Sequence, residues 1–194
     1  MNRKTLINAA MAIGLLLTLP GAVSAPAQAN EALWAALREG RAFAMMRHAL
    51  APGTGDPGNF DVNDCTTQRN LNGVGRDQAR RTGDVFRSQG INAAQVMTSA
   101  WCRCQETARL LNIGEPTVLE PLNSFFQNRG QRDPQTEALK QWLAARTGSE
   151  PLVLVTHQVN ISALTGEFAS SGEMVVVDRD VSSGVKVLGS LKPE

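Results

Sequence analysis

The sequence predicts an α/β protein, a three-layer α/β/α sandwich with a mainly parallel central sheet. Three observations lead to this fold class. Short apolar runs alternate with helical patterns along the chain, those runs contain almost no polar residues, and two of them end in a histidine. Strands that are apolar throughout are buried on both faces, as in parallel sheets that helices cover. We therefore expect helices on both sides of one sheet.

The expected elements follow in chain order. Residues 31–39 form an amphipathic helix that Gly40 ends, and residues 41–46 form a buried strand. Residues 51–64 contain several glycines and prolines, which predict a loop. Further helices are expected at 73–88, 103–111 and 136–146, and further strands at 94–99, 117–122, 151–156, 173–178 and 185–191.

The first 29 residues resemble a signal peptide. A short basic start, Arg3-Lys4, precedes an apolar stretch at residues 9–23, and Ala27-Gln28-Ala29 has the small-x-small pattern of a cleavage site. The apolar stretch is shorter than the roughly 20 residues that a membrane span requires. We expect cleavage after Ala29, a single catalytic domain over residues 30–194, a periplasmic or secreted location, and no stable membrane insertion of the mature protein.

Composition narrows the possible partners and cofactors. The formal net charge is +1 and aromatic residues make up 5% of the chain, so we expect no nucleic-acid partner. The three cysteines and two histidines lack the spacing of a metal site, which predicts that no metal or other cofactor is bound. In an oxidising compartment Cys65 could pair with Cys102 or with Cys104.

The residues that carry chemistry gather where the predicted strands end. One apolar strand leads into Arg47-His48 and another into His157, and these are the only two histidines in the chain. Ligands of open α/β sheets bind at the carboxyl ends of the strands. Arg103 follows a third strand and begins a helix, so it should lie at the same edge. These four residues predict a cationic pocket that suits a phosphate group.

Four sequence blocks, in order, resemble the histidine phosphatase superfamily, also called phosphoglycerate-mutase-like. They are the strand that ends in RH, QRNLNGVGRDQ at 68–78, SAWCRCQETA at 99–108 and VLVTH at 153–157. The resemblance extends from about Phe43 to Thr165. It implies that His48 is a nucleophile that forms a phosphohistidine, that Arg47 and Arg103 bind the phosphate oxygens, and that His157 donates to the same oxygens.

The chain departs from the family pattern at two positions. Ala49 stands where the family has glycine, and Ser124 stands where many members have the glutamate that acts as general acid. Glu106, one turn into the Arg103 helix, and Glu120, on the same side of the expected 117–122 strand as Ser124, are the candidate acids. Both could instead be structural ion-pair partners. Asp133, expected in a loop, is a third candidate.

Two further residues are candidates for substrate binding. Thr54 lies in the glycine-rich loop directly after the RHA motif, and Arg69 lies in the second sequence block. Either could reach the pocket or lie on the surface.

These expectations lead to a metal-independent phosphomonoesterase whose substrate is a small phosphorylated molecule or a phosphorylated envelope glycan. Some secreted members of the superfamily that resemble this chain act on phosphorylated heptose of lipopolysaccharide, which suggests a sugar phosphate. Two alternatives remain open. One is a catalytically weak phosphate-binding or envelope-interaction protein of the same fold, and the other is a metal-dependent hydrolase that uses the two histidines.

Overall fold

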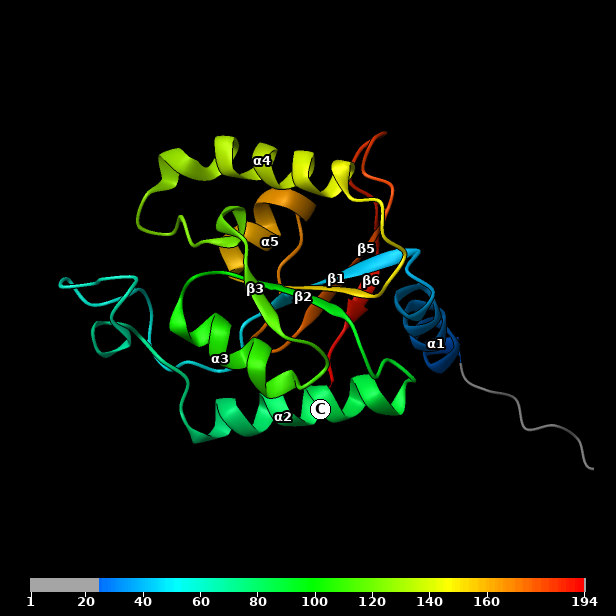
Figure 1. The fold of residues 1–194 in the computed structure, drawn as a ribbon, viewed down its shortest axis with the longest axis horizontal. Coiled ribbons are helices and arrows are strands. Elements are labelled where there is room, and N and C mark those ends of the chain that lie inside the picture. Colours follow the sequence, from blue (N-terminus) through cyan, green and yellow to red (C-terminus); the bar gives the residue numbers. More distant parts are fainter. Residues whose placement is uncertain (1–24, 194) are drawn as a thin grey trace, which may run out of the picture.

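The structure is a computed structural model that describes residues 25–193, and it has three layers (Figure 1). A six-stranded sheet lies between helices α1, α2 and α3 on one face and helices α4 and α5 on the other. The helices are α1 (Ala25–Arg38), α2 (Gly73–Ser88), α3 (Cys102–Leu111), α4 (Arg132–Ala145) and α5 (Gln158–Thr165). The strands are β1 (Ala42–Arg47), β2 (Gln95–Thr98), β3 (Pro116–Val118), β4 (Leu152–Thr156), β5 (Met174–Asp178) and β6 (Val187–Leu191). Short 3₁₀ helices are η1 (Cys65–Thr67), η2 (Glu120–Leu122) and η3 (Arg129–Gln131).

The sheet has the strand order β3-β2-β4-β1-β5-β6. Strands β3, β2, β4 and β1 are parallel to one another, and β5 and β6 extend the sheet in antiparallel pairing. The prediction of an α/β/α sandwich with a mainly parallel sheet is therefore confirmed. The parallel part contains all three strand ends at which the sequence places its candidate site.

Alternation along β1 explains why both faces of the sheet are covered. Ala44 and Met46 point into a core shared with α1, α2 and α3, while Phe43 and Met45 point into a second core shared with α4 and α5. All four side chains are almost completely buried. A strand with apolar residues on both faces can be stabilised only between two helical layers.

Two predicted elements were wrong in their extent. The strand expected at 117–122 ends at Val118, and residues Glu120–Leu122 form η2, because Pro121 has no N–H for a sheet hydrogen bond. The helix expected at 136–146 begins four residues earlier, at Arg132, so Asp133 lies in the first turn of α4 and not in a loop. Helix α5, directly after β4, was not predicted, since eight residues show too little periodicity.

The N-terminal prediction falls mostly outside the described residues. Residues 1–24 of the expected signal peptide are not among them, and α1 begins at Ala25, six residues before the expected start of that helix. Within residues 25–193 no helix is long and apolar enough to cross a membrane.

Close packing of α2 against α3 provides a test of the fold. A β-carbon on Gly83 in α2 would lie 2.1 Å from the carbonyl oxygen of Leu111, whereas a β-carbon on Gly73 in the same helix would meet nothing within 4 Å. We expect Gly83→Ala to lower the free energy of unfolding by about 1–3 kcal/mol. Gly73→Ala, the matched control, should leave it unchanged or raise it.

Urea denaturation of both variants provides the measurement. Without the close approach, Gly83→Ala would gain up to about 1 kcal/mol from helix propensity. Stabilisation by Gly83→Ala would therefore contradict this packing of α2 on α3.

Candidate active site

The pairing of β1 with β4 brings the two histidines together. Arg47 is in register with Thr156, and the N–H of His48 donates to the carbonyl oxygen of Thr156 at 2.9 Å, one residue beyond the last strand pair. His48 and His157 therefore leave neighbouring strands at the same edge. Their ring centroids are 5.5 Å apart.

The surroundings of His48 favour a neutral imidazole. Its imidazole is 3% exposed, and Nδ1 lies 2.7 Å from the carbonyl oxygen of Ala49. A carbonyl oxygen can only accept, so Nδ1 carries the hydrogen and Nε2 keeps a free lone pair. Burial and, after it, the positive charge of Arg103 lower the pKa of His48 to about 3. The ring is thus unprotonated at neutral pH.

The Nε2 atom of His157 has two polar neighbours. The hydroxyl of Ser99 lies 2.9 Å from Nε2 of His157, and the thiol of Cys104 lies 3.5 Å from the same nitrogen. The ring of Trp101 meets it edge-on, with centroids 5.4 Å apart. Burial first, and then the proximity of His48, lower the pKa of His157 well below its usual value.

Three guanidinium groups line the same cavity. Arg47 donates to the carbonyl oxygen of Ala169 at 3.0 Å, and Arg69 donates to those of Gly55 and Ala51. Arg103, at the start of α3, is 3% exposed and pairs with Asp56. The Nε atoms of Arg47 and Arg103 are buried and have no hydrogen-bond partner among residues 25–193. Both can donate to an anion that enters the cavity.

The cavity has a volume of about 240 Å³ and two chemically different parts. The three arginines and Asp56 make up its charged part, and the two neutral histidines line the cavity with them. The remaining lining is neutral and comprises Gly53, Thr54, Gly55, Trp101, Ser124, Phe126, Gln127, Gln158, Val159 and Phe168. Among the described residues, Asp56 supplies the only carboxylate that lines it.

The structure brings together most of the residues that the sequence suggested. Arg47, His48, Arg103 and His157 all line the cavity. The two less certain binding candidates, Thr54 and Arg69, line it as well.

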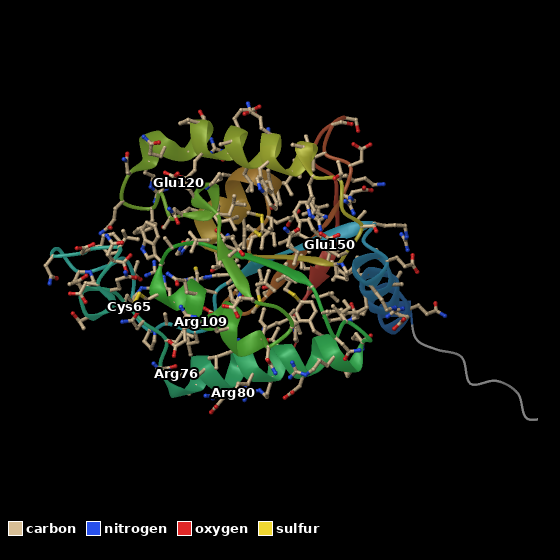
Figure 2. All side chains as sticks on the ribbon, viewed as in Figure 1. Cys65, Arg76, Arg80, Arg109, Glu120 and Glu150 are labelled. Carbon is tan, nitrogen blue, oxygen red and sulfur yellow. A yellow bond between two sulfur atoms is a disulfide. The ribbon has the colours of Figure 1, made fainter. Side chains whose placement is uncertain are left out.

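The structure brings neither of the two candidate glutamates into this cavity. Glu106 forms an ion pair with Arg76 of α2 at 2.6 Å and faces a separate surface hollow. Glu120 is exposed at the start of η2 and borders another hollow. In Figure 2, Glu120 lies on the α4 side of the molecule, away from Arg76 on α2. The expectation that Glu120 shares a strand face with Ser124 was wrong, because no strand forms there.

The alanine that replaces the family's glycine is accommodated away from the cavity. Ala49 is fully buried in a small cluster with Ala51, Leu71 and Ala79, and it does not line the cavity. Its N–H donates to the hydroxyl of Thr107 at 3.0 Å. The β-carbon therefore occupies core space and leaves the cavity side of the loop open.

Of the two disulfides that the sequence left open, the structure forms Cys65–Cys102. This bond joins η1 to the residue before Arg103, and Figure 2 shows Cys65 in the loop beside α3. Cys104 is a buried free thiol, and burial raises its pKa to about 12. It is thus poorly suited to act as a nucleophile.

Sequence reasoning missed Asp56 and Ser99 as members of the site. Asp56 lies in a glycine- and proline-rich loop, and its position depends on a loop conformation that composition does not determine. One signal could have pointed to it. Buried arginines need a counter-charge, and Asp56 is the first carboxylate after the Arg47-His48 pair.

Comparisons with known proteins give one family match and several matches of fold. Residues 45–123 match the family model of the histidine phosphatase superfamily (branch 1). No curated protein sequence matches the chain. SixA from Agrobacterium tumefaciens has 18% identity and a TM-score of 0.55, covering 79% of this chain and 99% of its own.

Two other solved structures were determined with bound oxyanions. The protein histidine phosphatase SixA in complex with tungstate has 17% identity and a TM-score of 0.56, covering 78% of this chain and 97% of its own. The mycobacterial glucosyl-3-phosphoglycerate phosphatase in complex with inorganic phosphate has 14% identity and a TM-score of 0.58, covering 79% of this chain and 97% of its own. At these identities the similarity establishes a shared fold.

The lowered pKa of both histidines can be tested directly. The chain contains only two histidines, so each imidazole gives its own signals. We expect the imidazole ¹⁵N shifts of His48 and His157 to remain those of neutral rings from pH 8 down to pH 5. Unfolded histidines take up a proton near pH 6.5. Folding stability should therefore fall as the pH drops below about 6.5 and continue to fall towards the folded-state pKa.

An NMR titration of the folded protein measures the protonation of the two imidazoles. Urea denaturation at several pH values measures the pH dependence of folding stability. A midpoint near 6.5 for either ring would contradict the buried, cation-flanked environment.

Proposed function

Because residues 45–123 match the family model of the histidine phosphatase superfamily, we propose that this chain belongs to that superfamily and hydrolyses a phosphate monoester through a phosphohistidine on His48. One observation supports the proposal most strongly. The Nδ1–H of His48 is bonded to the carbonyl oxygen of Ala49, which leaves a lone pair on Nε2 beside three guanidinium groups. A neutral nucleophile next to several cations suits attack on an anionic phosphorus centre.

The reaction proceeds in two balanced steps. In the first, the Nε2 lone pair of His48 forms a bond to phosphorus while the bond to the leaving-group oxygen breaks and its electron pair stays on that oxygen. In the second, water attacks the phosphohistidine, the P–N bond breaks, and inorganic phosphate leaves while His48 returns to its neutral form. Arg47, Arg69 and Arg103 stabilise the charge that spreads over the phosphoryl oxygens in both steps.

The proposal requires no metal ion. Positive charge that divalent cations supply in other phosphoryl-transfer sites comes here from the three arginines. Among residues 25–193, no group of three or more histidine, cysteine, aspartate or glutamate side chains could hold a metal ion. Undiminished turnover in excess chelator is the expected result, and loss of turnover would favour the metal-dependent alternative.

The neutral part of the cavity suggests the class of substrate. Ser124, Gln127 and Gln158 offer hydrogen bonds without charge, and the rings of Phe126 and Phe168 are 40% and 68% exposed. Amides, hydroxyls and open aromatic faces suit a neutral polar group with apolar faces, such as a sugar. We therefore propose a sugar phosphate or a phosphorylated envelope glycan. The name of the mycobacterial relative, a glucosyl-3-phosphoglycerate phosphatase, is in line with this choice.

The proposed compartment is the periplasm or the exterior of a bacterial cell. Its support is the signal-peptide pattern of residues 1–29 and the Cys65–Cys102 disulfide, since disulfides persist in oxidising compartments. A cell fractionation experiment that recovers the chain in the cytoplasm with residues 1–29 intact would contradict it.

One observation favours a second candidate function, a catalytically weak phosphate-binding protein of the same fold. Asp56, the one carboxylate that lines the cavity, is engaged in an ion pair with Arg103, so no described acid is free to protonate a leaving group. This alternative predicts tight tungstate binding without measurable turnover of any phosphate ester.

Replacing the nucleophile should nearly abolish turnover. We expect His48→Ala to reduce kcat for p-nitrophenyl phosphate by about 10³-fold or more, because the phosphohistidine cannot form. Arg80→Ala serves as a surface control, since Arg80 is exposed on α2 and pairs with the exposed Asp77. Initial rates of p-nitrophenol release provide the measurement. Equal rates for wild type and His48→Ala would refute the mechanism.

Removing the two glutamates should have little effect. Glu106→Gln and Glu120→Gln are expected to retain kcat within about two-fold, because both side chains lie outside the cavity. The same rate assay applies, with a simple alkyl phosphate added because its poor leaving group depends most on an acid. A selective loss of alkyl phosphate turnover in either variant would identify that glutamate as the acid.

A further inference from the structure

Asp56 is the least expected member of the cavity. It lies in the loop between β1 and α2, and its side chain is 5% exposed beside an Arg103 side chain that is 3% exposed. Oδ1 accepts from Nη1 of Arg103 at 2.6 Å, and Oδ2 accepts from Nη2 at 3.1 Å. The carboxylate therefore contacts the end of the guanidinium group that carries both Nη atoms.

The carboxylate also accepts two further hydrogen bonds. The N–H of Arg69 donates to Oδ1 at 3.1 Å, and the indole N–H of Trp101 donates to Oδ2 at 3.0 Å. Burial raises the pKa of Asp56, but the hydrogen bonds and charge of Arg103 outweigh it, so the pKa lies below its usual value. A carboxylate with two donors on each oxygen remains ionised and has no proton to give to a leaving group.

These contacts determine which donors of Arg103 remain free. Nη1 donates both to Asp56 and to the carbonyl oxygen of Arg69 at 3.2 Å, which uses both of its hydrogens. Nη2 gives one hydrogen to Asp56, and Nε is buried without a partner in the part of the chain that the structure describes. The two remaining hydrogens, on Nε and Nη2, lie along one edge of the planar group.

We propose that Asp56 is a positioning residue that holds Arg103 so that its Nε–Nη2 edge faces the substrate phosphate. Two parallel N–H donors on one edge match two phosphate oxygens, a geometry that lysine cannot provide. The negative charge of Asp56 also balances the positive charge of the buried Arg103. This pairing keeps Arg103 in place when the cavity is empty. This inference rests on the proposed function, and it assigns to Asp56 a role distinct from that of a proton donor.

The test compares Asp56→Asn with wild type in three measurements. They are kcat/KM for p-nitrophenyl phosphate, kcat/KM for an alkyl phosphate, and the Kd of tungstate by titration calorimetry. Asparagine keeps the shape of the side chain but places an NH₂ group against the donors of Arg103 and Trp101. We expect both kcat/KM values to fall and the Kd of tungstate to rise by a similar factor, up to about 100-fold, because the phosphate-binding edge of Arg103 is misplaced.

A proton-donor role would give a different pattern. Asp56→Asn would then leave tungstate binding and p-nitrophenyl phosphate turnover nearly unchanged, since neither needs an acid, and would selectively impair the alkyl phosphate. That pattern would overturn the proposal.

A second variant separates positioning from a general effect on the loop. In an Arg103→Lys background no guanidinium edge exists, so adding Asp56→Asn should weaken tungstate binding little further. If Asp56→Asn weakens tungstate binding by the same factor in wild type and in the Arg103→Lys variant, Asp56 acts through the loop and the inference is wrong. Melting temperatures of all variants show whether each remains folded.

The design also keeps this inference separate from the proposed function. Wild-type protein that binds tungstate but turns over neither ester would refute the phosphatase proposal, while the tungstate measurements would still test the role of Asp56. Wild-type protein that does not bind tungstate would overturn both.

Discussion

The parallel pairing of β1 with β4 is the constraint on which the site depends. It continues through the hydrogen bond from His48 to the carbonyl oxygen of Thr156, so the two histidines leave adjacent strands at the same level. A slip of one residue would exchange the two faces of β1, because side chains alternate along a strand. Phe43 and Met45 would then enter the core that Ala44 and Met46 now fill. Core packing and site geometry are thus set by the same register.

Burial and charge together determine the chemical state of the site. Burial first, and then the excess of positive charge from three guanidinium groups over one carboxylate, disfavours protonation of both imidazoles. A neutral His48 with its hydrogen on Nδ1 has the lone pair that attack on phosphorus requires. The cations that would stabilise a phosphoryl group therefore add to the effect of burial, which keeps His48 neutral.

The sequence allowed the fold class and the centre of the site to be predicted, because both depend on local features. Apolar runs that end in Arg47-His48 and His157 indicate parallel strand ends directly. Glu120 was misplaced because Pro121 ends the strand on which the argument relied. Asp56 was missed because loop conformation determines its position. The choice between Cys102 and Cys104 depended on the rotation of α3, which points Cys104 into the core and Cys102 towards η1.

The central claim is that Nε2 of His48 accepts the phosphoryl group. Rapid quenching of the enzyme during turnover of p-nitrophenyl phosphate, followed by peptide mass spectrometry under non-acidic conditions and ³¹P NMR, locates the phosphorylated atom. We expect one phosphoryl group per chain, on Nε2 of His48, because Nδ1 carries the hydrogen that is donated to the carbonyl oxygen of Ala49. A phosphoryl group on His157 or on Nδ1 of His48, or turnover without any phosphorylated intermediate, would contradict it.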